Sequence, residues 1–342
     1  MKSNGCALMR SSIAMSDTIM QTFVLLRRNF ADFGFVPMML DIDKRSCVER
    51  VQEVLSNQGF TAYPMQDIDD AQFEKLSEIG LLDEQIRKTP AAALLMRSDE
   101  QVSVLCNAED HLLIRVEAEE EDVLGAVKTA KDLARLISSQ YPFAKDERIG
   151  WLTARPLYAG TGLQVCYKLH LPMLTMLQQA KTIAAALYQE HRFSLSALYH
   201  QDEKNPSSLF ILCNQFTAYD NTHSLADAVL ELALGLNTKE TNLREKILKR
   251  TIRSTYLDQV YRAYGILKYA RRLNEPEFLE YWSKLRLGAA AGLIPLTLEK
   301  VDGLLRKAGK ASLLTARDTA KDDHTLYFAR ADIVRAELDG GQ

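Results

Sequence analysis

The pattern of hydrophobic and polar positions divides the chain into two parts. Short apolar runs separated by polar turns are typical of antiparallel strands, and they predict strands at 92–96, 102–106, 112–116, 165–170, 195–199 and 209–213. Helical spacing of apolar residues predicts helices at 46–57, at 70–88 with a break at Gly80, at 119–140 and at 172–191. Together these elements predict an α+β fold in which helices flank a central antiparallel sheet.

Beyond residue 238 the strand pattern does not return, and helices are predicted at 239–273, 275–291, 296–307 and onward to 338. We therefore expect an α+β domain over residues 21–238, followed by an all-helical C-terminal domain over 239–342. The first residues lack the continuous apolar segment of a signal peptide. Residues 1–20 are expected to form a disordered extension of a cytoplasmic protein, or to lie upstream of a later start at Met15 or Met20.

Composition narrows the classes of function. The 42 basic and 45 acidic side chains leave a net charge of -3, which gives no electrostatic reason to expect nucleic-acid or membrane binding. No apolar run reaches the length of about 18 residues that a transmembrane helix needs. The five cysteines are widely spaced and form no CxxC pair. This spacing argues against a disulfide framework or a zinc site, and predicts buried, inert thiols in the strands.

A glycine-rich loop enters the strand predicted at 165–170. The segment Ala159-Gly160-Thr161-Gly162 precedes it, and glycine allows backbone amides to approach an anion closely. The loop lacks the Lys-Ser/Thr pair of a phosphate-binding P-loop. A tight turn before a strand therefore stays open as the alternative.

Four motifs in order carry a resemblance to a known family: NAEDHL (107–112), GWLTARPLYAGTGL (150–163), LHLP (169–172) and LFILCNQ (209–215). Their order and spacing resemble the ATP:guanido phosphotransferases, the family of creatine and arginine kinases. WSKLRLGAAAGLI (282–294) and FARADIVRAEL (328–338) point to the bacterial protein-arginine kinase (McsB-type) branch. The resemblance implies a guanido-kinase-like domain over 21–238, and ATP with Mg²⁺ as cofactor if the protein is active.

The resemblance also implies which residues would perform the chemistry. In the family a carboxylate holds the acceptor guanidinium and takes its proton, and Glu109 occupies that position here. A second carboxylate of the family falls at Lys204, with Glu203 one position away, so Glu203 is the second catalytic candidate.

The phosphate-binding arginines of the family are replaced. Their four alignable positions hold Phe23, Leu25, Leu113 and Gln164. Arg115 is predicted on the same strand face as Leu113, and Arg155 stands in place of the family's reactive cysteine. The candidate cofactor-binding residues are Arg115, Arg155, Gly160, Thr161, Gly162 and Gln164. Four lost charge-assisted hydrogen bonds, at roughly 1.5–3 kcal/mol each, predict a deficit of about 6–12 kcal/mol in transition-state stabilisation.

The final segment resembles half of the family's phosphoarginine-reading motif. One register uses Arg330, and the other uses Asp332 and Arg335. A plain amphipathic helix with exposed charges is the alternative.

These observations support three hypotheses. The first is a catalytically impaired regulatory or scaffolding homologue in protein quality control. The second is an active kinase that uses Glu109 as base with a clamp of Arg155, Arg115 and Arg192. The third is a sensor that binds nucleotide or phosphoarginine without transfer. The expected partners are protein substrates or an active kinase paralogue. By family, a zinc-binding activator and Clp protease machinery are also expected, with a homodimer as the assembly. No nucleic acid, membrane or bound metal is expected.

Overall fold

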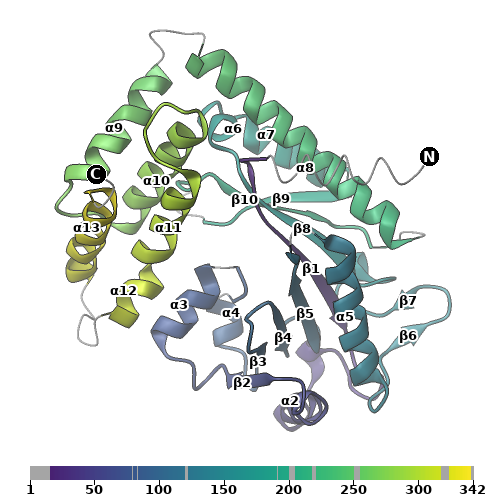
Figure 1. Ribbon diagram of the computed structural model, residues 1–342. Coiled ribbons are helices and arrows are strands. Elements are labelled where there is room, and N and C mark those ends of the chain that lie inside the picture. The colour runs from purple at the N-terminus through teal and green to yellow at the C-terminus, as the bar shows by residue number, and fades with distance from the viewer. Residues whose placement is uncertain are drawn as a thin grey trace.

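The computed structural model describes residues 16–78, 80–82, 84–119, 122–190, 192–199, 205–217, 221–249, 255–316 and 323–339. Its centre is an eight-stranded antiparallel sheet with the strand order β2-β3-β4-β5-β1-β8-β10-β9 (Figure 1). The strands are β1 (Ile19–Arg28), β2 (Phe60–Pro64), β3 (Ala93–Arg97), β4 (Val102–Cys106), β5 (Leu112–Glu117), β8 (Leu163–His170), β9 (Phe193–Ala197) and β10 (Leu209–Asn214). A short hairpin, β6 (Lys145–Asp146) and β7 (Gly150–Trp151), stands apart from this sheet.

One face of the sheet carries the main hydrophobic core. The helices α2 (Asp41–Leu55), α5 (Val123–Ser138) and α8 (Thr222–Arg244) pack there, and Figure 1 shows α5 and α8 along one side of the sheet. Side chains alternate along a strand, so Val24 and Leu26 of β1 enter this core. Phe23, Leu25 and Arg27 consequently lie on the opposite face.

The opposite face is covered in part by α3 (Asp70–Glu78) and α4 (Glu84–Arg87). Phe73 and Leu76 of α3 pack on Leu94 of β3 and Leu105 of β4 in a second hydrophobic cluster. This cluster lies over β3 and β4. The part of the face formed by β1, β8 and β10 is outside it.

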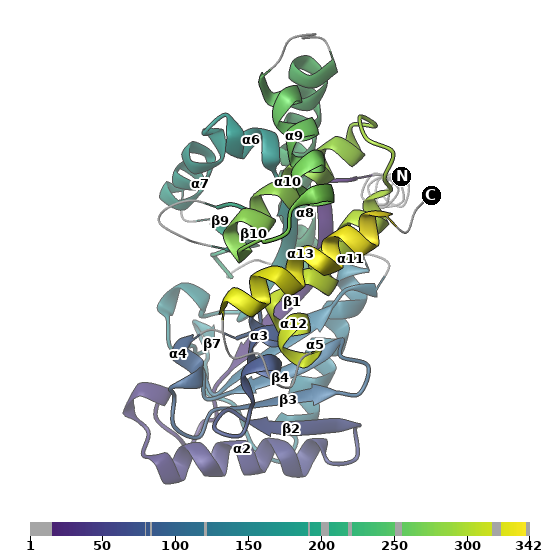
Figure 2. The same cartoon turned by 90° about the vertical axis from the view of Figure 1, so that its left-hand side faces the viewer.

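The C-terminal part of the chain is helical. It contains α9 (Thr255–Tyr269), α10 (Glu275–Ala290), α11 (Leu298–Ala308) and α13 (Asp323–Asp339) around the buried Trp282. The helix α12 (Lys310–Ala316) packs against α13 in a smaller cluster. Figure 2 shows α9 and α2 at opposite ends of the molecule, with α13 between them. The helix α12 contacts α3, where the amide of Ala311 donates to Glu78 at 3.0 Å. The helical part therefore lies on the same side of the sheet as α3.

A buried polar network also joins the two parts. His170 at the end of β8 hydrogen-bonds the Ser283 hydroxyl of α10 at 2.9 Å, and Arg286 of α10 donates to the Asp17 carbonyl at 2.7 Å. Arg244 of α8 is in turn ion-paired with Asp17. The helical part is thus anchored at the end of the sheet where β1 begins and β8 ends.

The structure differs from the sequence predictions at several elements. The strand β1 begins at Ile19, and Asp17 is paired, so residues 16–20 are ordered in the structure. The helix α8 continues to Arg244 through the expected domain boundary at 238. The helix predicted at 172–191 is two helices, α6 (Pro172–Met176) and α7 (Gln179–Gln189), because Gln178 adopts φ 58°. Within the described residues, no helix is both long enough and apolar enough to cross a membrane.

Candidate functional site

The turn between β4 and β5 is fixed by its own buried side chains. Asn107 adopts φ 57°, and its side-chain amide donates to two backbone carbonyls at 2.7 and 2.8 Å. The Nδ1 atom of His111 accepts from the amide of Phe30 at 2.9 Å, so Nε2 carries the proton and donates to the Gly34 carbonyl at 2.7 Å. Burial lowers the pKa of His111. The neutral ring therefore orients the turn that carries Glu109.

Asp110 connects this turn to the loop that follows β7. Its carboxylate is buried, and Oδ1 accepts from the Asn29 side chain at 2.7 Å and from the amide of Ala154 at 2.6 Å. Asn29 also accepts from the amide of His111 at 2.9 Å and donates to the Leu152 carbonyl at 3.1 Å. Since both side chains are buried, these bonds hold the turn and the loop together.

Glu109 and Arg155 meet where the turn and the loop approach each other. The Nε atom of Arg155 donates to Oε1 of Glu109, and the two form an ion pair. The Glu109 side chain is 37% exposed and that of Arg155 is 64% exposed. The carboxylate that the resemblance assigns to an acceptor guanidinium is therefore already in contact with a guanidinium.

Side chains of β1, β5, β8 and β10 that point away from the main core form one surface, which we call the clamp face. Strand register places Leu25 opposite both Arg115 of β5 and Gln164 of β8. The four positions at which the resemblance expects arginines all lie on this face. Its members are Phe23, Leu25, Arg27, Leu113, Arg115, Gln164, Cys166, Lys168, Ile211 and Cys213.

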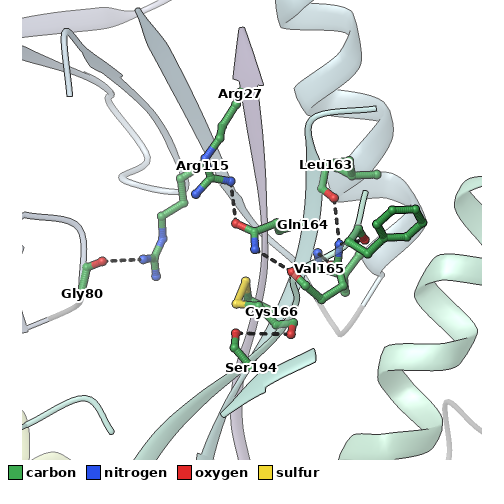
Figure 3. Close-up of a disulfide and its surroundings, with 11 residues drawn as sticks. Arg27, Gly80, Arg115, Leu163, Gln164, Val165, Cys166 and Ser194 are labelled. Atoms are coloured by element: carbon green, nitrogen blue, oxygen red, sulfur yellow. Dashed lines mark hydrogen bonds between the residues drawn. A yellow bond between two sulfur atoms is a disulfide. The ribbon is translucent and has the colours of Figure 1, made fainter. Parts of the chain in front are cut away.

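Arg27 is a site residue that the sequence analysis did not single out. It lies on the clamp face two residues beyond Leu25, and it donates to Oε1 of Gln164 at 2.5 Å (Figure 3). Its Nε is 3.6 Å from Asp110 Oδ2, and its guanidinium stacks 4.1 Å from the ring centroid of Tyr158. The period-two alternation of a strand could have placed Arg27 beside Leu25, had residues 19–28 been recognised as a strand.

Arg115 lies on the clamp face, as predicted, and it is committed to internal partners. Its Nε donates to Glu117 at 2.8 Å, and its guanidinium lies 3.9 Å from the ring centroid of Phe23. It also points toward the Gly80 carbonyl, at 3.5 Å (Figure 3). Its side chain is 4% exposed. Arg115 is thus held toward Phe23 and Glu117, whereas Arg27 lies on the other side of Leu25.

A disulfide joins Cys166 and Cys213 across β8 and β10 (Figure 3). The prediction of inert thiols was therefore wrong for these two residues. The register pairs them directly, with Cα atoms 4.4 Å apart, although 47 positions separate them in sequence. They form a small apolar cluster with Phe23, Leu25 and Ile211. Cys47 and Cys106 are free and buried.

Lys168 lies two residues beyond Cys166 on the clamp face, and Arg115 and Glu117 influence it electrostatically. Burial, followed by the charge of Arg115, lowers the pKa of Lys168 to about 8. The cations that β1, β5 and β8 present on this face are Arg27, Arg115 and Lys168.

The glycine-rich loop uses its backbone to dock on its neighbours. Gly160 exchanges two backbone hydrogen bonds with Trp151, at 2.8 and 3.0 Å. The hydroxyl of Thr161 donates to the Thr217 carbonyl at 2.6 Å. Gly162 adopts φ 64°, and a Cβ there would lie 2.8 Å from a β1 carbonyl oxygen, so only glycine fits. Chain packing therefore accounts for the glycine at position 162.

The residues of the phosphoarginine-reader-like segment have internal partners on α13. Arg330 is 1% exposed and donates to the carbonyls of Ala308 at 2.9 Å and Leu273 at 3.1 Å. Arg335 donates to the Ala270 carbonyl and to Asp332, each at 2.5 Å. The helix is therefore attached to α9 and α11 through these arginines.

The second catalytic candidate and possible metal-binding groups complete the description of the site. Glu203, the second catalytic candidate, lies outside the residues that the structure describes. Within the described ranges, His, Cys, Asp and Glu side chains form no group of three or more that could hold a metal ion.

Comparison with known proteins gives one consistent result. The family model for the ATP:guanido phosphotransferase C-terminal catalytic domain matches residues 44–242, and the model for the protein-arginine kinase McsB C-terminal domain matches residues 253–341. The chain is 28% identical to the protein-arginine kinase of an Exiguobacterium species, over 97% of this chain and 96% of that protein. It is 28% identical to that of Clostridium tetani over 96% and 97%, and to that of Bacillus subtilis over 82% and 78%.

Solved structures of guanidino kinases share the fold. The duplicated taurocyamine kinase of Schistosoma mansoni aligns with a TM-score of 0.54 and 16% identity, over 72% of this chain and 37% of that duplicated chain. Lombricine kinase aligns with a TM-score of 0.54 and 14% identity, over 67% and 68%. The match to the catalytic-domain model covers more than half of this chain. The chain therefore belongs to the ATP:guanido phosphotransferase family, in the protein-arginine kinase (McsB) branch.

Proposed function

We propose that this chain is a non-catalytic member of the protein-arginine kinase branch that acts in regulation or as a scaffold. The observation that carries the proposal is the composition of the clamp face. None of its four expected arginine positions holds an arginine, and the two arginines that it does carry, Arg27 and Arg115, are each bonded to side chains of the same molecule.

The expected energetic effect is large. Phosphoryl transfer from ATP depends on positioning and on cations that neutralise the transferring group. At roughly 1.5–3 kcal/mol for each charge-assisted hydrogen bond, four missing arginines amount to about 6–12 kcal/mol. That deficit corresponds to a loss in rate of about 10⁴- to 10⁹-fold.

The remaining side chains of the clamp face also do not suit a triphosphate. Phe23, Leu25 and the Cys166–Cys213 disulfide present apolar atoms where phosphate oxygens need hydrogen-bond donors. Lys168 is one remaining cation, and burial with the charge of Arg115 lowers its pKa to about 8, so it is partly neutral above that pH. We therefore derive no transfer step through ATP for this chain.

A second candidate function is an active protein-arginine kinase with a rearranged clamp. Two observations favour it: the relatives in the comparison are named protein-arginine kinases, and Arg27 interacts electrostatically with both Arg155 and Glu109. Arg27 contacts Gln164, which stands at one of the expected arginine positions. In this alternative Arg27 replaces that arginine, and Glu109 is the base.

Phosphoarginine mass spectrometry separates the two functions. The purified chain is incubated with Mg²⁺–ATP and an arginine-rich protein substrate, with the Bacillus subtilis protein-arginine kinase as positive control. The proposal expects no phosphoarginine above the level of a Glu109→Gln variant. Turnover by the native chain that Glu109→Gln and Arg27→Ala both abolish would refute the proposal and establish the second function. Calorimetric titration with ATP, ADP and a phosphoarginine peptide tests whether the chain is a sensor.

A regulatory role requires a protein partner. By family, this proposal names an active protein-arginine kinase, a zinc-binding activator or Clp-type protease machinery, in a cytoplasmic homodimer engaged in protein quality control. Light scattering of the eluting protein on a sizing column measures the oligomeric state, and co-elution with each purified candidate tests the partners. A monomeric mass at micromolar concentration would contradict the homodimer.

A further inference from the structure

The Glu109–Arg155 pair is a contact between two partly exposed side chains that no packing requirement explains. The Arg155 side chain is mostly exposed, and that of Glu109 is partly exposed. The pair nevertheless joins the carboxylate at the acceptor position of the family to a guanidinium, which is the chemical group of the acceptor.

The loop that carries Arg155 is fixed next to Glu109 by a buried residue. Asp110 accepts from the amide of Ala154 at 2.6 Å, one residue before Arg155. The hydroxyl of Thr153 donates to the carbonyl of Arg155 at 2.7 Å, which closes a short turn. The two consecutive carboxylates thus have different tasks: Asp110 holds the loop backbone, and Glu109 holds the arginine head. Because its backbone is already fixed, the Arg155 side chain loses less conformational entropy when it pairs with Glu109.

From this arrangement we propose that Arg155 is an internal substitute for an acceptor arginine and occupies the guanidinium site of Glu109. The inference rests on the proposed function only in taking Glu109 as the guanidinium-binding carboxylate. When Arg155 is removed, Glu109 becomes available to an alkylguanidinium, such as an arginine side chain of a second protein. Arg155 thereby determines whether this turn binds arginine from outside.

The charges around Glu109 set the size of the effect. Arg27 interacts electrostatically with both Glu109 and Arg155, and Asp110 interacts with Arg155. Arg27 is also bonded to Gln164 and stacked on Tyr158. Removal of Arg155 leaves these contacts unchanged. An exposed ion pair of this kind is a weak competitor, so its removal should raise the affinity for a guanidinium ligand about 1.5- to 5-fold.

The test is a titration of the full chain with N-acetyl-arginine amide, followed by NMR. N-acetyl-citrulline amide, its neutral isostere, reports contacts that need no charge. Arg155→Ala is expected to bind the arginine compound more tightly than the native chain, and the gain should vanish in Arg155→Ala/Glu109→Gln. Arg148→Ala, which removes an exposed arginine of the β6–β7 hairpin, is the matched control and should bind like the native chain. An affinity of Arg155→Ala equal to that of the native chain overturns the inference, as does a gain that persists without Glu109.

A second measurement observes the pair directly. The Nε–H resonance of Arg155 should shift on Glu109→Gln, and it should shift in the same direction when the arginine compound is titrated into the native chain. A resonance insensitive to Glu109→Gln overturns the inference. The binding result does not depend on phosphoryl transfer. Turnover in the phosphoarginine assay would refute the proposed function and leave this site intact, whereas unchanged binding by Arg155→Ala would refute this site alone.

Discussion

Replacement of Arg330 by alanine tests whether this buried arginine holds the helical domain together. Its side chain is 1% exposed and connects α13 to two backbone carbonyls, that of Ala308 at 2.9 Å and that of Leu273 at 3.1 Å. A hydrogen bond from a charged group contributes roughly 1.5–3 kcal/mol, and its loss leaves a buried carbonyl without that donor. Arg330→Ala should therefore lower the free energy of unfolding by about 3–5 kcal/mol.

Urea unfolding followed by tryptophan fluorescence measures this effect. The chain has two tryptophans, and Trp282 is buried in the helical core with its indole N–H bonded to the Val301 carbonyl at 2.8 Å. In a Trp151→Phe background, fluorescence therefore reports the helical domain alone. Arg262→Ala is the control, because Arg262 is 72% exposed and its ion pair spans 3.9 Å; its effect should stay within about 0.5 kcal/mol.

The same variants separate a structural role from phosphoarginine reading. If Arg330 reads phosphoarginine, its replacement abolishes binding of a phosphoarginine peptide and leaves the urea midpoint in place. A shift for Arg330→Ala within about 1 kcal/mol of that for Arg262→Ala would refute the structural reasoning.

Three further predictions concern the rest of the chain. Cys166→Ser removes a disulfide between residues 47 positions apart and should lower the free energy of unfolding by up to about 4 kcal/mol. Dithiothreitol should lower the stability of the native chain by the same amount. A dithiothreitol effect of equal size on the Cys166→Ser variant would contradict this prediction. Burial, then the charges of Glu275 and Glu74, raises the pKa of Glu78 to about 7. The folded state thus holds that proton more tightly than the unfolded state, and the free energy of unfolding should fall as pH rises from about 4.5 to 7. If the native chain and the Glu78→Gln variant show the same dependence of stability on pH, the prediction is wrong. Lys168, with its pKa lowered to about 8, should titrate below the other lysines in ¹³C NMR of the reductively methylated protein, a result that Lys168→Arg should remove.

The sequence located most of the strands because each carries its own periodic signal. The run at 102–106 is β4 to the residue, and those at 112–116 and 209–213 each miss one residue. The strand β1 was missed, because a central strand buried on both faces is a near-continuous apolar run with weak alternation. That omission hid Arg27, since its place beside Leu25 follows only once the segment is known to be a strand.

Part of the candidate site could likewise be identified from the sequence, and part only from the fold. The order of the motifs around Glu109, Gly160 and Gln164 led to the family, and the family models confirm it. The four positions at which the resemblance expects arginines could also be read from the sequence. The residues that now fill the space could not, because β8 lies between β1 and β10, and the register across these strands brings together residues far apart in the chain.

The sequence by itself determined most of the strands and the family, since each of these depends on short patterns of neighbouring residues. Only the tertiary structure decided which side chains became partners. Arg155 meets Glu109, Arg27 meets Gln164, and Cys166 bonds to Cys213. Each pair joins different strands or loops, and packing of the whole sheet sets their register. No local pattern specifies such a contact, so only the fold shows these partners.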